Sequence, residues 1–220
     1  MQRKNFIQTA FLLFLCVLVF VNCSDKPSDK LFEFYKVNIV SPNPKQTFDS
    51  LRERHNLPVF WEFKEGEGYA SGGLLLANAV LDIKTYFDST QTTAEPMELV
   101  LTTQLSDSVA FKTLVKKGIS ANQPFRRDGW FWSVITLPDL NIMGNQSNGV
   151  YITRYDDARL HSRELDSLQL GTTTRLESIV VYSPDAEELK SNWNKLNLED
   201  SDPAVSFVLH EKSKVEIIID

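Results

Sequence analysis

Two similar stretches decide how this sequence folds: Lys36-Val37-Asn38-Ile39-Val40-Ser41-Pro42-Asn43 and, near the C-terminus, Ser178-Ile179-Val180-Val181-Tyr182-Ser183-Pro184-Asp185. Each is a β-rich run, then a Ser-Pro-Asx turn, then an amphipathic segment, which predicts a strand followed by a helix. We expect Asn43 and Asp185 to cap these helices, because such side chains accept hydrogen bonds from the free N–H groups of a first turn. The recurrence indicates a fold that uses one βα unit more than once.

Working outward from these stretches, the chain divides into three units, 31–88, 96–155 and 174–220. The first reads as a βαβββ set that ends with a strand at 78–84. The second has a strand at 99–102, a helix capped by Ser106, and strands at 130–135 and 150–152. In the third, the strand at 178–182 and its helix precede runs at 205–209 and 215–219, which predict a closing hairpin. The third unit therefore reads as one strand shorter than the first.

Residues 1–22 read as an export signal, because Arg3 and Lys4 precede a short apolar run at 11–21. This run is shorter than the ~20 residues of a spanning helix. It ends at Asn22-Cys23-Ser24-Asp25, which resembles the lipobox of bacterial lipoproteins, where the cysteine is lipidated. Asn22 departs from the usual small residue before that cysteine, and the alternative is a plain secretory peptide with an incidental Cys23. Residues 23–30 are polar and contain proline, as a tether should.

Composition narrows the possible partners. The 220 residues are 42% hydrophobic and 24% charged, which is ordinary for a globular protein, and the net charge is −6. We expect neither nucleic acid nor anionic lipid as a partner, because phosphate binding requires clustered Lys and Arg. The two cysteines, Cys16 and Cys23, both lie in the N-terminal segment. The domain that follows therefore has no disulfide framework and no cysteine-based metal or redox site.

Three segments, in this order, resemble the glyoxalase-like domains of the vicinal oxygen chelate superfamily. They are Ile39-Val40-Ser41-Pro42-Asn43, Ala77-Asn78-Ala79-Val80-Leu81-Asp82 and Arg126-Arg127-Asp128-Gly129-Trp130-Phe131-Trp132. The resemblance implies an α+β fold in which repeated βαβββ modules form a cup-shaped, partly open β-barrel with helices outside, as in glyoxalase and bleomycin-resistance proteins. It covers residues from Phe34 to the C-terminus.

The resemblance also implies a divalent metal in the cup, held by His or Glu on the first and last strands of paired modules. Carried over, the first-unit positions fall at Lys36 and Asp82, and an ammonium group cannot replace an imidazole ligand. The matching positions are Ser178 and Glu216 in the third unit, or Glu98 and the 153–154 region in the second. None of the three histidines forms an HxH or HxxxH pair. We therefore expect no cofactor and no tight metal site, with Asp82 and Glu216 as weak candidates.

The remaining candidate residues suggest a binding site. Trp130 and Trp132 share one face of a strand, and with Arg126 or Arg127 nearby they suit a flat or anionic molecule. The alternative is a plain aromatic core. Lys36 and Asn38 lie on the non-helix face of the first strand. Asp82 with Glu98 would form an acid–base pair if they share the cup, and otherwise they are surface carboxylates.

Two functions follow from these observations. The first is a lipid-anchored glyoxalase-like protein of the bacterial cell envelope that binds a small, anionic molecule or a partner protein in its cup without metal catalysis. The alternative is a metal-dependent lyase, isomerase or dioxygenase of the vicinal oxygen chelate type with a non-standard site. A homodimer that completes the third unit is compatible with both. A metal assay separates the two functions.

Overall fold

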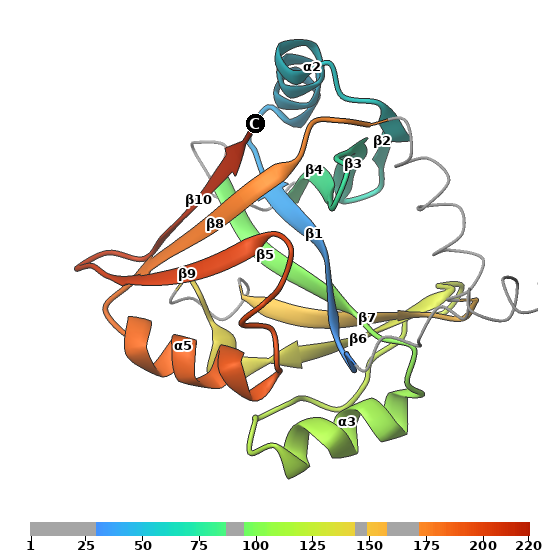
Figure 1. Cartoon of the computed structure of the whole chain (residues 1–220). Coiled ribbons are helices and arrows are strands. Elements are labelled where there is room, and N and C mark those ends of the chain that lie inside the picture. Colours follow the sequence, from blue (N-terminus) through green and yellow to red (C-terminus); the bar gives the residue numbers. More distant parts are fainter. Residues whose placement is uncertain (1–29, 87–94, 144–148, 158–171) are drawn as a thin grey trace, which may run out of the picture. The chain divides into compact units, whose positions relative to one another are not determined.

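A seven-stranded sheet forms the centre of the protein (Figure 1), with strand order β2-β3-β4-β1-β5-β7-β6. The computed structural model describes residues 30–86, 95–143, 149–157 and 172–220. The predicted signal at 1–22, Cys23, the tether up to residue 29, and His161 lie outside the described residues. Residues from Leu31 to Asp220 form one compact unit, and the description below concerns this unit.

The first unit is a complete βαβββ module. It comprises β1 (Glu33–Val40), α2 (Pro44–His55), β2 (Val59–Gly66), β3 (Tyr69–Leu75) and β4 (Val80–Tyr86). β4 returns to pair in parallel with β1, while β2, β3 and β4 pair antiparallel in sequence. Pro44 stands at the first position of α2, where its missing N–H has no helical partner to lose.

The second unit lacks one strand. It comprises β5 (Glu95–Thr102), α3 (Asp107–Lys116), β6 (Trp132–Leu137), the 3₁₀ turn η1 (Pro138–Leu140) and β7 (Val150–Tyr155). A single bridge between Phe125 and Val134 stands where the first unit has its second strand. Pro124, directly before Phe125, has no N–H to donate to a ladder, which limits the pairing here. β5 pairs antiparallel with β1 and parallel with β7, so the two units share one sheet.

The third unit forms a separate sheet. β8 (Leu176–Ser183), α5 (Ala186–Lys195), β9 (Ala204–Leu209) and β10 (Lys214–Ile219) give the order β10-β8-β9. The predicted closing hairpin is wrong, because β9 pairs in parallel and β10 antiparallel with β8, on its opposite sides. This unit thus has one strand fewer than the first, as predicted, and it also differs from the first in strand order.

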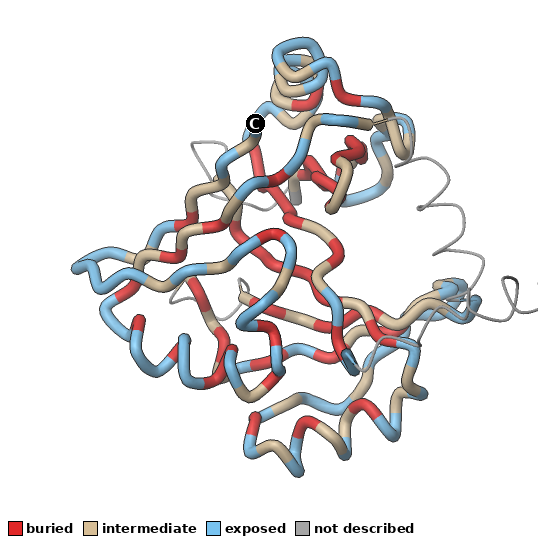
Figure 2. The backbone as a smooth tube through the Cα atoms, viewed as in Figure 1, coloured by how far each residue is buried: buried red, intermediate tan, exposed pale blue. Residues whose placement is uncertain are grey.

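The two faces of the large sheet differ in chemistry. Val37 and Ile39 of β1 enter a main core that also takes Phe48 of α2, Leu114 of α3 and Trp193 of α5. The helices and the small sheet therefore pack on one face, and buried residues line the strands between them (Figure 2). The opposite face carries a smaller apolar cluster around Tyr35, Leu75, Val80 and Val100. None of the helices in the described ranges has the length and apolar character needed to cross a bilayer.

The large sheet stays open, since β2 and β6 are its edges. The architecture is thus α+β, with paired modules in one unclosed sheet and helices on one face, as the resemblance implied. Only the first of the three units is a full βαβββ module.

The Ser-Pro-Asx turns do the same structural work in both copies, but through a different residue from the one expected. Asn43 and Asp185 make no side-chain capping bond. Instead, the hydroxyl of Ser41 accepts the backbone N–H of Asn43 at 3.1 Å, and Ser183 accepts that of Asp185 at 3.1 Å. Both serines are buried. The serine hydroxyl, not the Asx side chain, therefore fixes the start of each helix.

Candidate functional site

A polar cluster lies on the sheet face opposite the helices, where β4, β1, β5 and β7 run side by side. Asn38 of β1 is level with Asp82 on β4 and with Glu98 on β5. Lys36 and Lys84, each two residues along their strands, lie on the same face because strand side chains alternate. The predicted site residues Lys36, Asn38, Asp82 and Glu98 are therefore brought together.

Two ion pairs form the centre of this cluster. Lys36 Nζ lies 2.9 Å from Asp82 Oδ2, and Lys84 Nζ lies 2.6 Å from Glu98 Oε2. The side chains of the first pair are 15% and 9% exposed, and those of the second 11% and 6%. Charges buried to this degree are stable only when paired, because each loses its hydration. Each carboxylate is thus neutralised by its own ammonium group.

Neutral side chains donate further hydrogen bonds to the same two carboxylates. Ser71 donates to Asp82 Oδ1 at 2.8 Å, while Asn38 Nδ2 and the Tyr151 hydroxyl donate to Glu98 Oε2 at 2.6 and 3.1 Å. Burial by itself raises the pKa of Asp82, but the ammonium groups of Lys36 and Lys84 and the bonds from Lys36 and Ser71 lower that pKa below its usual value. Asp82 is therefore a carboxylate at neutral pH. It is not a proton donor.

Two aromatic rings flank the Lys36 ammonium group. Its Nζ lies 5.5 Å from the ring centroid of Trp61 and 5.9 Å from that of Tyr35. The indole of Trp61 can take this position because residue 73 is a glycine; a Cβ added at Gly73 would lie 2.4 Å from the indole. Trp61 Nε1 in turn donates to Ser71 Oγ at 3.3 Å. The cation is thus held by a carboxylate and by two ring systems, which attract it through their faces.

A line of aromatic rings connects this cluster to the end of β6. Trp130 stacks on Trp132 with centroids 4.7 Å apart and an interplanar angle of 15°. Trp132 lies 6.5 Å from Tyr155, and Tyr155 lies 5.8 Å from Tyr35 edge to face. The predicted indole pair is therefore continuous, through two tyrosines, with the ring beside Lys36.

The two predicted arginines behave differently. The guanidinium of Arg126 makes a bidentate pair with Asp156, one arm of which measures 3.0 Å. Hydrogen bonding from Arg126 holds the pKa of Asp156 below its usual value. Arg127 is exposed beside it. Arg126 therefore serves first to hold its own loop, and it lies at the outer end of the ring line and not beside Lys36.

Comparison with known proteins concerns the fold alone. No protein-family model matches the chain, and no curated protein does. A hypothetical protein from Staphylococcus aureus has a similar structure, with a TM-score of 0.60 and 12% identity over 84% of this chain and 90% of that one. Methylmalonyl-CoA epimerase from Mycobacterium tuberculosis gives a TM-score of 0.46 at 11% identity over 63% of this chain and 97% of its own. Another methylmalonyl-CoA epimerase, in complex with methylmalonyl-CoA, gives 0.45 at 15% identity over 57% and 95%.

The order and direction of the strands identify the fold. Parallel β1 and β4 lie beside parallel β5 and β7 in one open sheet whose helices cover a single face. The chain has a glyoxalase-like fold.

The metal that this glyoxalase-like fold implies does not fit the residues present. Asp82 and Glu98 each already bind an ammonium group, and Lys36 repels a dication at the position of a first ligand. Glu216 belongs to the small sheet, on β10, where Tyr182 donates to it at 3.0 Å and Lys214 pairs with it. Within the described ranges, no group of three or more His, Cys, Asp or Glu is placed to hold a metal ion.

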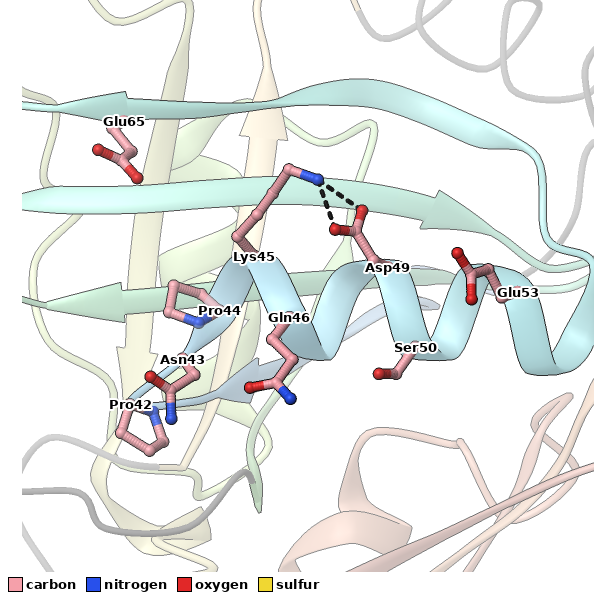
Figure 3. Close-up of a pocket in the computed structure, with 9 residues that line it drawn as sticks. All are labelled: Pro42, Asn43, Pro44, Lys45, Gln46, Asp49, Ser50, Glu53 and Glu65. Atoms are coloured by element: carbon pink, nitrogen blue, oxygen red, sulfur yellow. Dashed lines mark hydrogen bonds and ion pairs between the residues drawn. The ribbon is translucent and has the colours of Figure 1, made fainter.

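A cavity of about 530 Å³ lies elsewhere, along the first turns of α2 (Figure 3). Asp49, Glu53 and Glu65 line it, and Lys45 is bonded to Asp49 at 2.6 Å. Three carboxylates against one paired ammonium group do not suit an anion. None of the predicted site residues lines this cavity.

The sequence analysis missed several members of the polar cluster: Tyr35, Trp61, Ser71, Lys84, Tyr151 and Tyr155. Lys84 could have been predicted from the sequence, because a residue two positions after Asp82 on a strand shares its face. Tyr151 could be found in the same way from the 153–154 region assigned by the resemblance. Trp61 and Ser71 give no such signal, because only the pairing of β3 with β4 brings Ser71 to Asp82, and only the pairing of β2 with β3 adds Trp61.

Proposed function

We propose that this chain is an exported, lipid-anchored glyoxalase-like protein that binds a small anionic molecule with an apolar body, without metal catalysis. The lipid is carried by Cys23, and the protein resides in the bacterial cell envelope. Binding takes place on the sheet face opposite the helices, along the ring line from Trp130 to Lys36.

The observation that carries this proposal is the pairing of Lys36 with Asp82 and of Lys84 with Glu98. An enzyme of the vicinal oxygen chelate type places its metal between such strands. In this chain the ammonium groups of Lys36 and Lys84 pair with Asp82 and Glu98, so neither carboxylate is left to coordinate a metal. The paired charges sum to zero, and the cluster as a whole rigidifies the face of the sheet.

The ligand class follows from the surrounding groups. Apolar rings at Trp132, Tyr155 and Tyr35 offer a surface for an apolar body. Cationic groups stand at both ends of the ring line: Lys36, paired with Asp82, at one end, and Arg126, paired with Asp156, at the other, where the exposed Arg127 is best placed to meet an anion. A carboxylate at one end of an apolar ligand matches this arrangement, because charged hydrogen bonds to such an anion are the strong ones.

A paired series of ligands tests the proposal. The processed chain would be titrated with aromatic carboxylates and with their neutral amides, and tryptophan emission and thermal unfolding would be followed. We expect carboxylates to bind about tenfold or more tightly than the matching amides, since one charged hydrogen bond contributes ~1.5–3 kcal/mol. Arg127→Gln should reduce the difference, Trp132→Leu should weaken the binding of carboxylates and amides alike, and Leu209→Ser, on the small sheet, should change neither. Equal affinity for carboxylates and amides would contradict the proposed ligand class.

A further inference from the structure

The loop before β6 presents large apolar side chains to solvent. Phe125 is 59% exposed and Phe131 is 60% exposed. Phe125 packs edge to face on Trp130 at 6.1 Å, and Phe131 packs edge to face on Trp132 at 4.8 Å. We call Phe125, Trp130 and Phe131 the aromatic tip. Adjacent exposed rings of this kind mark interaction sites, because water solvates them poorly.

The aromatic tip is held in place by hydrogen bonds. The N–H of Asp156 donates to the carbonyl of Phe131 at 2.9 Å, and the N–H of Phe125 donates to the carbonyl of Val134 at 2.9 Å. The Arg126–Asp156 pair ties the same loop to the end of β7. Gly129, with φ of 82°, supplies the left-handed turn between them. The rings are therefore kept outside the core by a defined loop.

The aromatic tip lies at the end of the sheet where the domain begins. Glu33, at the start of β1, lies opposite Thr102 of β5, and Thr102 lies opposite Thr153 of β7. Two residues further along β7, Tyr155 lies opposite Trp132, the first residue of β6. The start of β1 is thus about three strand spacings, roughly 14 Å, from the start of β6. Leu31, the first residue of the compact unit, is itself 40% exposed. A chain tethered through residues 23–30 has its tether attached at this same end.

Charge at the aromatic tip also differs from the rest of the protein. Arg126 and Arg127 are exposed within the loop and are balanced by Asp128 and by Asp156, which pairs with Arg126, so the loop is close to neutral, whereas the chain as a whole has a net charge of −6. Aromatic rings flanked by arginine suit the interface of a bilayer, where rings enter the headgroup level and guanidinium groups meet phosphate. An acidic body without such a loop would be repelled by anionic lipid.

We infer that the aromatic tip inserts into the phospholipid interface of the membrane to which Cys23 ties the chain. The inference rests on the lipid anchor of the proposed function. The lipid holds the chain at one point through a polar tether, so a second contact at the aromatic tip, which lies close to the bilayer once the chain is anchored, strengthens attachment. It also orients the domain, with the start of β1 and the outer end of the ring line facing the lipid.

Vesicles with brominated lipid test the inference directly. The processed chain, residues 23–220, carries one cysteine and can be coupled through the Cys23 thiol to a maleimide phospholipid. This supplies an anchor whether or not cells acylate Cys23, so failure of the anchor proposal stays distinguishable. The vesicles contain phosphatidylethanolamine, phosphatidylglycerol and brominated phosphatidylcholine. We expect brominated lipid to quench tryptophan emission, because Trp130 reaches the headgroup level.

Variants then locate the contact. Phe125→Ser combined with Phe131→Ser should reduce the quenching at least twofold, and Phe125→Ser alone should reduce it in part. Leu209→Ser, which removes an exposed apolar side chain of β9, should leave it unchanged. Arg127→Gln should weaken quenching only when phosphatidylglycerol is present. No quenching in the coupled protein, equal quenching in all variants, or an emission change with soluble peptidoglycan fragments in place of lipid would overturn the inference.

Discussion

Asp82 shows how this sheet keeps a charged side chain inside the protein. Burial raises the pKa of its carboxyl group, but Lys36, Lys84 and Ser71 together lower that pKa below its usual value. Because the folded-state pKa lies below the unfolded value, the ionised carboxylate stabilises the fold above the unfolded pKa of ~3.9. This stabilisation is lost as the pH falls through the folded pKa.

Lys36→Met should therefore destabilise the protein strongly at neutral pH. The change leaves Asp82 charged and buried without its nearest cation, which typically costs ~3–5 kcal/mol of unfolding free energy. The loss should shrink as the pH is lowered towards 4, because the carboxyl can then take up a proton. Urea unfolding at several pH values measures both effects.

The double variant Lys36→Met with Asp82→Leu is the control. It removes both charges and should recover most of the lost stability, since a pair of apolar side chains needs no counter-ion. A double variant as unstable as the single one would mean that packing around Lys36, and not its charge, determines the effect.

Ser183 tests the turn that both repeats share. Its buried hydroxyl accepts the N–H of Asp185 at 3.1 Å, so Ser183→Ala should lower the unfolding free energy by ~1 kcal/mol or more. Ser41→Ala should do the same in the first unit. Asn43→Ala should cost less, because its side chain makes no capping bond. Equal losses at Ser41 and Asn43, read from denaturant midpoints, would contradict this account of the turn.

At the scale of elements, Asn78 joins the first unit to the third. Its side-chain amide copies a strand partner, donating to the carbonyl of Leu176 at 2.9 Å and accepting the N–H of Leu176 at 2.9 Å. The backbone N–H of Ala77 adds a bond to the carbonyl of Thr174 at 2.9 Å. The start of β8 is therefore fixed against the turn between β3 and β4.

Asn78→Ala should destabilise the protein by ~1–3 kcal/mol, because it leaves both polar groups of Leu176 without this partner. Hydrogen exchange should increase first in β8 and its neighbours β9 and β10. Asn122→Ala removes one exposed bond to Thr136 and serves as the matched control, with a change within ~0.5 kcal/mol. Uniform exchange across both sheets in Asn78→Ala would show that the third unit does not depend on this link.

The sequence allowed local elements to be predicted better than their pairing. Val37 and Ile39 alternate with Lys36 and Asn38, so the strand and its two faces could be read directly. The hairpin at β9 and β10 was wrong because two apolar runs joined by a short turn ordinarily pair with each other. Here β8 lies between them, and that choice depends on which partners bury Val181 and Val215 in the main core, which no local pattern encodes.

At the scale of the whole molecule, the candidate site was predicted in part. Lys36, Asn38, Asp82 and Glu98 could be placed together because the resemblance assigns them to the facing strands of paired modules. That the second unit, and not the third, pairs with the first could not be read from the sequence. This pairing brings Glu98 and Tyr151 to Asn38 and puts Glu216 in another sheet. The second ion pair depends on Lys84, which shares a strand face with Asp82 but meets Glu98 only because β1 pairs with both β4 and β5.

Cys23→Ser should release the protein from membranes. Stable attachment requires acyl chains, and the aromatic tip alone gives a weak, reversible contact. Membranes from cells that make each form would be washed with carbonate and the protein located by immunoblot. A Cys23→Ser protein that still sediments with washed membranes would show that another segment anchors it.

The central claim is that Lys36 and Lys84 occupy this glyoxalase-like site in place of a metal. Elemental analysis of the protein purified without chelator tests it most directly, with Asp82→Ala and Glu216→Ala as companions. The account predicts zinc, iron, manganese and cobalt far below one atom per chain in all three proteins. Near-stoichiometric metal in the native chain that is lost in Asp82→Ala would contradict it and favour a metal-dependent enzyme.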